Sequence, residues 1–470
     1  PEQVRVNAAD LSAGVSALAR AHQVPGGQLA VHHCGETVAV EFGELRYGSG
    51  QRVTREAAFP IGSISKTFTA TLAMILVADG DLELDAALGE YLPELDRPVG
   101  ELTLRHLLSH TSGFASDVAA DEPTTSIRRY VLDHCGPQNL VFSPGAGFSY
   151  SNIGYVLAGH LLEVITGMSW WGAMESVLLQ PLGIDPAFIV GSGLGSGRLG
   201  PGARAQASGH SVNPAASRIR PVDQSLTQSR SPAGALAVSA VDLIALGLTQ
   251  LPGRADMLLP SAYAEQMRRP VPGAEPFGLA DGWGLGLALF QHPASQHEAC
   301  QWVGHDGNSD GTACALRVDP QSGCVIAFTS NASTGIAMWR DLVPELAKMG
   351  LPISNYSTAE VLTRSALPPV DCQGSYLNGD SEYCVRAQQN GQFVLLIDGD
   401  PVARLSFYDD LIFSQRDLES GEWGHAGRFL RNPATGDIDR IQVDGRLACR
   451  RTAPPDEDGR CLSLTGVLSP

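Results

Sequence analysis

The hydrophobic pattern of the chain changes between Gly350 and Val370, and this change constrains the fold more than any other feature. Between Ser63 and Leu179, apolar residues recur three and four positions apart, as in amphipathic helices. The tail instead has short alternating runs, such as Phe393 to Ile397, separated by the turn signals NGD, DGD and VDGR. Alternating runs joined by tight turns favour a small antiparallel barrel or sandwich. A chain of 470 residues is also long for one core. We therefore predict two domains, at residues 1–355 and 371–470.

The first of these domains mixes helices with strands. Terminal helices and strands at both ends surround a central helical block, which suggests an antiparallel sheet covered by helices. Residues 191–234 are rich in Gly, Ser, Pro and Arg and have little periodicity, so they are interpreted as a long surface excursion and a candidate lid. The expected helices are 8–22 and 334–349, and the expected strands are 28–33, 36–42, 285–290, 300–303, 312–318 and 325–329.

Composition excludes several classes of function. A formal net charge of −18 disfavours nucleic acid and anionic membranes as partners. No apolar run reaches the roughly 18 to 20 residues of a membrane-spanning helix, and no export signal is visible at the start. Nine cysteines without a C-x-x-C pair favour reduced thiols over zinc or a disulfide framework. We expect a cytoplasmic protein with no metal and no cofactor.

Ser63 and Lys66 are the first residues with a chemical signature. They lie in FPIGSISKTFTATLAM, where a glycine-containing turn enters an apolar helix. A spacing of three places the hydroxyl and the amine on one helical face. A buried lysine with a lowered pKa can take the proton of a serine, which is otherwise a poor nucleophile. S-x-x-K alone is weak evidence, because a capped surface helix has the same pattern.

Two further motifs strengthen this interpretation. FSYSNIGYVLAG places Tyr150 and Asn152 just before an apolar helix, where a phenol can relay a proton and an amide can orient the lysine or bind a substrate carbonyl. WVGHDGNSDGT gives H-x-G at residues 305–307, on what could be an edge strand that pairs with an extended substrate. The other histidines, including His110, lack such context and are interpreted as core or surface residues.

Together, the three motifs resemble the serine β-lactamase and penicillin-binding-protein superfamily, in the branch of class C β-lactamases, D-aminopeptidases and related esterases. The resemblance covers roughly residues 8–350. It implies a sandwich with an antiparallel sheet flanked by helices, plus an all-helical subdomain. It also implies acylation of Ser63, with proton transfer by Lys66 and Tyr150, and a second oxyanion donor in the backbone N–H of Asn308. The substrate-binding residues that it implies also include Asn152, Gly234, Asp306 and Gly307.

One departure from the family pattern concerns His305, because many members have K-T-G where this chain has His-Asp-Gly. A lysine offers a permanent cation for a substrate carboxylate, whereas histidine is largely neutral at pH 7. The departure therefore argues against efficient β-lactam hydrolysis and favours peptidase, amidase, esterase or acyl-transfer activity. His305 is predicted to complete the polar wall of the site as a catalytic residue.

The tail, with CQGSYLNGDSEYCV and VDGRLACRR, extends the resemblance to stand-alone penicillin-binding-protein-type thioesterases, which are surugamide-cyclase-like. That resemblance implies a lipocalin-like barrel beside the active site. It further implies trans-acting cyclisation of a peptidyl thioester, with a D-residue at its C-terminus, delivered by a carrier-protein domain of a nonribosomal peptide synthetase. Arg446 is the candidate for receiving the carboxylate of the nucleophile residue, although a solvated arginine has the same sequence signature.

Two alternatives remain open at this stage. A D-stereospecific peptidase, amidase or esterase shares the first half-reaction, so the motifs do not separate it from a cyclase. A sensor that becomes acylated once and stays acylated is disfavoured, because the side chains of Tyr150 and His305 can still transfer protons. The sequence leaves open the peptide, its ring size, the oligomeric state, and whether Lys66 or Tyr150 is the base in each step.

Overall fold

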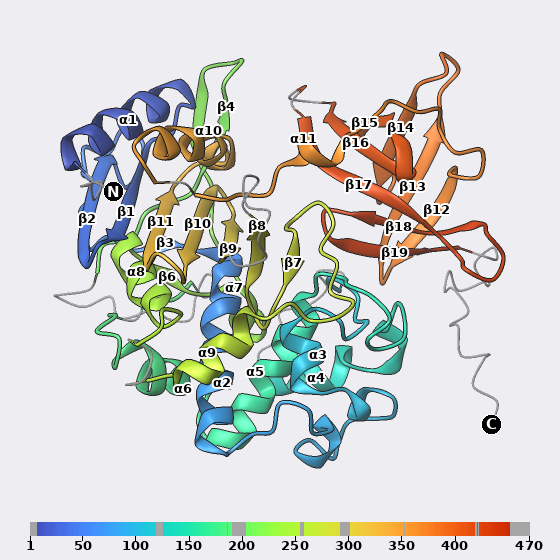
Figure 1. The fold of residues 1–470 in the computed structure, drawn as a ribbon, viewed down its shortest axis with the longest axis horizontal. Coiled ribbons are helices and arrows are strands. Elements are labelled where there is room, and N and C mark those ends of the chain that lie inside the picture. Colours follow the sequence, from blue (N-terminus) through green and yellow to red (C-terminus); the bar gives the residue numbers. More distant parts are fainter. Residues whose placement is uncertain are drawn as a thin grey trace.

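A seven-stranded antiparallel sheet forms the centre of the first part of the molecule (Figure 1). The computed structural model describes residues 7–118, 126–185, 187–189, 204–253, 258–291, 301–351, 353–418, 421 and 423–451. The sheet order is β2-β1-β11-β10-β9-β8-β7, so β1, from the start of this region, pairs with β11, from its end. Its strands are β1 (Gly26–His33), β2 (Glu36–Gly43), β7 (Gly282–Trp283), β8 (Ala288–Gln291), β9 (Gln301–Ser309), β10 (Thr312–Asp319) and β11 (Cys324–Ser330).

Helices cover both faces of this sheet (Figure 1). On one face, α1 (Ala8–Ala21) and α10 (Gly335–Lys348) pack against the strands and against each other. On the other face lie α8 (Ala240–Leu248) and a helical block centred on α2 (Ser65–Asp79) and α5 (Asn152–Thr166). Residues 65–76 of α2 are buried on all sides, so this helix has no solvent-facing stripe. The remaining helices of the block are α3 (Leu104–Leu108), α4 (Ile127–His134), α6 (Trp170–Ala173), α7 (Ser231–Gly234) and α9 (Ser261–Arg268).

The predicted antiparallel sheet with helical cover and a helical subdomain is confirmed. Residues 191–203 of the predicted surface excursion lie outside the described residues. The part that follows contains the hairpin β4 (His210–Asn213) and β5 (Arg218–Pro221), and then α7. His210 and Ser231 in this part are fully buried, so the described portion is anchored in the protein rather than lying wholly on its surface.

The tail forms a closed barrel of eight antiparallel strands in sequential order. Each strand pairs with the next one along the chain, and β12 also pairs with β19 to close the barrel. Tyr376, Phe413 and Phe429 belong to its own buried cluster. The predicted small antiparallel barrel is therefore confirmed, whereas the limits 1–355 and 371–470 stay a prediction. The strands are β12 (Gly374–Asn378), β13 (Ser381–Ala387), β14 (Phe393–Ile397), β15 (Asp400–Phe407), β16 (Ile412–Asp417), β17 (Trp423–Arg431), β18 (Ile438–Val443) and β19 (Arg446–Arg450).

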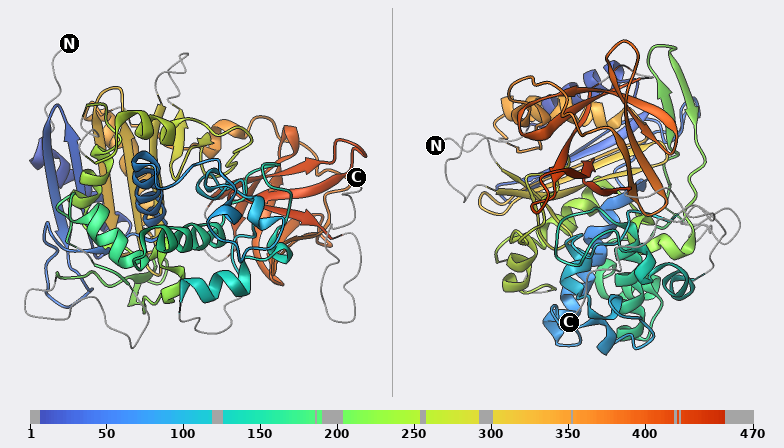
Figure 2. Two further views of the ribbon diagram at one scale, coloured as in Figure 1. Left: turned by 90° about the horizontal axis from the view of Figure 1, so that it is seen from below. Right: turned by 90° about the vertical axis from the view of Figure 1, so that its right-hand side faces the viewer.

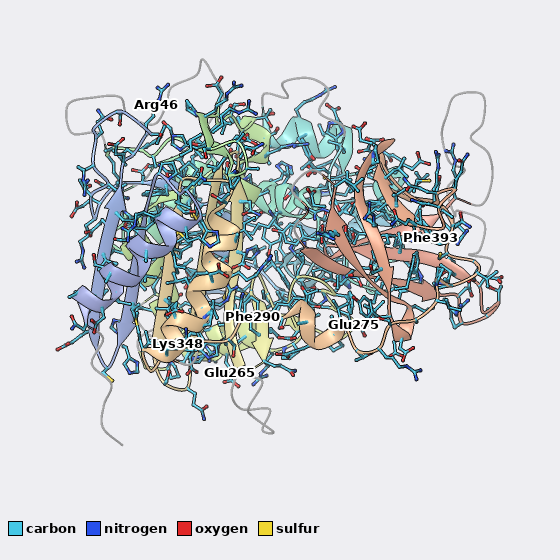
Figure 3. The ribbon with its side chains drawn as sticks, turned by 90° about the horizontal axis from the view of Figure 1, so that it is seen from above. Arg46, Glu265, Glu275, Phe290, Lys348 and Phe393 are labelled. Carbon is cyan, nitrogen blue, oxygen red and sulfur yellow. The ribbon has the colours of Figure 1, made fainter. Side chains whose placement is uncertain are left out.

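The barrel lies beside the sheet and the helical block, as the two views in Figure 2 show. Glu275 marks this junction in Figure 3, between the sheet and the barrel strands. Its carboxylate pairs with Arg428 of β17 at 2.8 Å, and its carbonyl accepts a hydrogen bond from Gln442 of β18 at 2.9 Å. The barrel is thus joined to the loop that precedes β7 by both side-chain and backbone groups.

Candidate active site

Ser63 and Lys66 occupy the start of α2, in the relation that the S-x-x-K spacing predicts. Ser63 lies in a short 3₁₀ turn, Gly62–Ile64, that leads directly into the helix. Lys66 Nζ lies 3.1 Å from Ser63 Oγ and donates a second hydrogen bond to the carbonyl of Ala233 at 2.9 Å. Gly62 has a φ of +50°, and a Cβ there would lie 2.0 Å from the carbonyl oxygen of Asn308. Only glycine therefore allows the nucleophile turn to approach strand β9 this closely.

The environment of Lys66 favours its neutral form. The side chain is fully buried, and burial lowers its pKa to about 7; nearby Asp117 opposes this change and Arg446 adds to it. A lysine that is about half neutral at pH 7 can accept the Ser63 proton and return it later in the reaction.

Tyr150 and Asn152 lie on either side of Ser151, which caps the N-terminus of α5. Lys66 Nζ is 4.9 Å from the centre of the Tyr150 ring. Burial raises the pKa of Tyr150, and the Ser63 hydroxyl and Arg446 oppose part of that increase. Tyr150 therefore joins the Ser63–Lys66 pair as a phenol. Asn152 differs from expectation, because its Nδ2 donates to Asp117 Oδ2 at 2.6 Å.

The barrel reaches this site through the hairpin between β18 and β19. The carbonyl of Gly445, in the turn of this hairpin, accepts a hydrogen bond from the backbone N–H of Tyr150 at 2.9 Å. The guanidinium of Arg446 lies 5.7 Å from the centre of the Tyr150 ring. The structure thus brings Arg446 to the site, 296 residues along the chain from Tyr150.

Strand β9 forms the wall opposite the nucleophile turn. It is an interior strand rather than the expected sheet edge, because β8 pairs with it. That pairing stops at Gly304, however, and no strand among the described residues continues it beside 305–309. This part of β9 therefore behaves as a local edge, created by the shortness of β8. Gly307 faces the nucleophile turn, where a Cβ would lie 1.9 Å from the carbonyl oxygen of Ile61.

His305 and Asp306 point to opposite faces of β9, as neighbours on a strand do. The Asp306 carboxylate forms a two-point ion pair with the buried Arg317, at 2.7 and 3.1 Å, so the structure does not bring it to Ser63. His305 Nδ1 lies 2.6 Å from the Asp306 carbonyl, which makes Nδ1 the protonated nitrogen. Its Nε2 is buried with no partner among the described residues. Burial lowers the pKa of His305 to about 4, so this ring presents a neutral hydrogen-bond acceptor at pH 7.

Other residues at the site were missed from the sequence. His110 is buried as expected of a core residue, but its ring centre lies 4.3 Å from that of Tyr150, and its Nδ1 accepts from the Ser151 N–H. Trp283 lies between two histidines, with ring centres 5.3 Å from both His110 and His305. The segment LLSHTSGF, which lies between the S-x-x-K and Y-x-N motifs, is the sequence signal that could have indicated His110.

Gly234 lies at the end of α7, one residue from the site contact itself, which is the carbonyl of Ala233. Within the described ranges, no group of three or more His, Cys, Asp or Glu residues is arranged to hold a metal ion. Over the same ranges, the helices lack the combination of length and hydropathy needed to cross a bilayer.

Comparison with known proteins supports the interpretation of this site as that of a serine β-lactamase-like protein. The Beta-lactamase family matches residues 11–347. Penicillin-binding protein 4 of Amycolatopsis lactamdurans is 33% identical over 352 residues, which covers 72% of this chain and 89% of that protein. The crystal structure of SurE is 37% identical with a TM-score of 0.82, covering 94% of this chain and 98% of that chain.

A more distant solved structure supports the fold alone. D-amino acid amidase from Ochrobactrum anthropi SV3 is 23% identical with a TM-score of 0.59, and the match covers 73% of this chain and 99% of that chain. The match to SurE covers 94% of the chain. It therefore includes the barrel, which runs from Gly374 to Arg450. The predicted resemblance to the serine β-lactamase and penicillin-binding-protein superfamily is therefore confirmed, and the chain belongs to the Beta-lactamase family.

Proposed function

We propose that the protein is a trans-acting peptide cyclase that takes a peptidyl thioester onto Ser63 and releases it as a head-to-tail macrolactam. The observation that carries this proposal is the β18–β19 hairpin, which places the Gly445 carbonyl and the Arg446 cation beside Tyr150. A hydrolase needs only water for its second step, whereas a cyclase needs a surface that orients the incoming end of the peptide. The likeness to SurE, which includes the barrel, supports the same assignment.

In the first half-reaction, Ser63 Oγ forms a bond to the thioester carbonyl carbon while its proton passes to neutral Lys66. The oxyanion would be stabilised by the backbone N–H groups of Ser63 and Asn308. The intermediate then expels the thiolate of the carrier arm, which takes a proton from Lys66, directly or through Tyr150. The products are a free thiol and a peptidyl ester on Ser63, and Lys66 is neutral again.

In the second half-reaction, the N-terminal amine of the same peptide attacks the ester carbonyl. The amine gives a proton to neutral Lys66, directly or through the Tyr150 phenol, the bond between carbonyl carbon and Ser63 Oγ breaks, and Ser63 recovers that proton from Lys66. Lys66 exchanges the proton and His305 is a neutral acceptor, so Arg446 is the lasting cation beside Tyr150. Its guanidinium would bind the carbonyl end of the incoming residue, a carboxylate in a free amino acid and a peptide carbonyl in a head-to-tail substrate.

The test is product analysis by mass spectrometry with a linear peptidyl N-acetylcysteamine thioester that ends in a D-residue. The choice of a D-residue follows the superfamily resemblance, and SurE itself has been solved with D-Leu. We expect a ring, lighter by one water than the linear acid, as the main product. The matched thioester ending in the L-residue is expected to react much more slowly. Linear acid as the only product would replace the cyclase with a D-stereospecific hydrolase.

Arg446→Gln sharpens this test. Loss of the guanidinium should lower the ratio of ring to acid by about tenfold, with a smaller effect on thiol release, because it acts on the second nucleophile. Arg440→Gln is the matched control, since Arg440 is a barrel arginine paired with its neighbour Asp439. An equal change in both variants would contradict a role for Arg446 in orienting the amine.

A further inference from the structure

Asn378, the last residue of β12, is a buried amide whose side-chain groups are all used at the boundary of the barrel. It is 1% exposed. Its Oδ1 accepts from the backbone N–H of Ser116 at 2.7 Å. Its Nδ2 donates to the carbonyl of Leu447 at 2.7 Å and to Ser149 Oγ at 3.2 Å. One barrel side chain therefore holds two segments of the helical block together with strand β19.

These two segments carry Tyr150, Asn152 and Asp117. Ser149 directly precedes Tyr150, and its hydroxyl also accepts from the Leu447 N–H at 3.2 Å. The Ser116 carbonyl accepts from the Asn152 N–H at 2.8 Å, and the next residue is Asp117, which receives the Asn152 side chain. Displacement of Asn378 would therefore disturb both members of the Y-x-N motif.

The following residue, Gly379, brings the barrel turn close to the same segment. Its φ is +61°, and a Cβ there would lie 2.7 Å from Ala115 Cβ. Real Cβ atoms do not approach this closely, so any side chain at residue 379 would push the turn away. Gly391, in the next turn of the barrel, has a similar φ of +79° but nothing within 4 Å of its Cβ position.

We propose that Asn378 is a positioning residue that couples docking of the barrel to the placement of Tyr150 and Asn152 at Ser63. The barrel is then part of the acyl-transfer site and not only a platform for the second nucleophile. This inference rests on the acyl-enzyme chemistry of the proposed function but not on ring closure. Thiol release, which counts ring and acid together, is therefore the readout that separates the two.

The first experiment compares Asn378→Ala with Asn390→Ala, an exposed asparagine in the turn that contains Gly391. Thiol release from the peptidyl thioester is measured as kcat and KM, normalised to the folded fraction from near-ultraviolet circular dichroism. We expect kcat of Asn378→Ala to fall at least tenfold with KM changed less than threefold, because the reacting groups are displaced while the substrate surface remains. Asn390→Ala should stay within twofold of the parent.

The second experiment keeps the amide and moves the turn. Gly379→Ala should lower kcat by a similar factor, whereas Gly391→Ala should carry the same backbone strain with no effect on kcat. This pair decides the matter if Asn378→Ala does not fold. The proposal is overturned by a fall of less than threefold in kcat of Gly379→Ala, or by an equal fall in its control.

The pH profile supplies a readout that loss of stability alone would not change. Asp117 raises the pKa of Lys66, and Asn378 holds the residue before Asp117. Release of this segment should therefore move the acidic limb of the thiol-release profile to lower pH in Asn378→Ala and Gly379→Ala. An unchanged limb in both would contradict positioning of the site and leave Asn378 as a stabilising residue only.

Discussion

The helical block and sheet differ from the barrel in what they contribute to the site. The first region supplies the proposed reacting groups: Ser63 and Lys66 at the start of α2, and Tyr150 before α5. The barrel supplies a carbonyl at Gly445 and a cation at Arg446, which contact the Tyr150 segment; within the described residues, neither group is hydrogen-bonded to Ser63. The chemistry is thus local to one region, whereas its alignment depends on both. Four predictions test this division, from the largest expected effect to the smallest.

Removing the nucleophile should have the largest effect. Ser63→Ala should lower thiol release by about 10⁴-fold or more and abolish covalent labelling by a fluorophosphonate, because no acyl-enzyme can form. Ser65→Ala is the control on the same helix, since its Oγ accepts from the Leu236 N–H and is not the nucleophile. Retained turnover in Ser63→Ala would overturn the whole assignment.

The second prediction concerns pH. Because Lys66 has a pKa of about 7 and must be neutral to accept the Ser63 proton, thiol release should rise with pH through about 7. At pH 6 the rate should be about tenfold below its plateau. Lys66→Arg should remove this limb and lower the rate by about 10³-fold, since a guanidinium does not lose its proton. A limb near pH 4 alone would instead identify His305, whose pKa is lowered to about 4, as the base.

The third prediction tests the barrel hairpin. Gly445 has a φ of +70°, and a Cβ there would lie 2.3 Å from Leu279 Cδ1. Gly445→Ala should therefore shift the carbonyl that holds the Tyr150 N–H, and we expect kcat to fall by about 10- to 100-fold. Gly436→Ala, with a φ of +80° and open space around it, should match the loss of thermal stability without the loss of kcat. Equal kcat values in the two variants would confine the barrel to a role after acylation.

The fourth prediction separates stability from activity at β9. Asp306→Asn weakens the ion pair to the fully buried Arg317, and the free energy of unfolding should fall by about 2 kcal/mol, since the carboxylate itself is half exposed. kcat/KM should stay within about threefold, because this carboxylate lies on the face away from Ser63. Asp439→Asn is the control for the stability change, because both side chains of its pair with Arg440 are partly exposed, whereas Arg317 is fully buried. A tenfold rise in KM for Asp306→Asn would instead support the predicted substrate-binding role.

Structural features that depend on only a few neighbouring residues could be predicted from the sequence. Apolar periodicities of two and of three to four residues predicted the alternating strands of the barrel and α1, because burial repeats at the pitch of the element itself. S-x-x-K was informative for the same reason, since one helical turn places Lys66 beside Ser63. Arg446 was placed by resemblance, and the structure brings it to Tyr150.

Features that depend on contacts between residues far apart in the sequence could not be predicted from it. β8 stops pairing at Gly304, which turns an interior strand into a local edge, and nothing in the sequence of β9 indicates this. Trp283 and His110 contact one another through pairing and packing of segments more than 170 residues apart. Asn378 resembled an ordinary turn residue in NGD, because the groups that it binds lie in other parts of the chain.

The position of the β18–β19 hairpin near the end of the described chain has a consequence for biosynthesis. A ribosome completes Ser63, Lys66, Tyr150 and His305 well before it reaches Gly445 and Arg446. The hairpin can therefore dock against the Tyr150 segment only after almost every other strand has been made. We expect nascent chains to remain poor acyl-transfer catalysts until the last barrel strand closes.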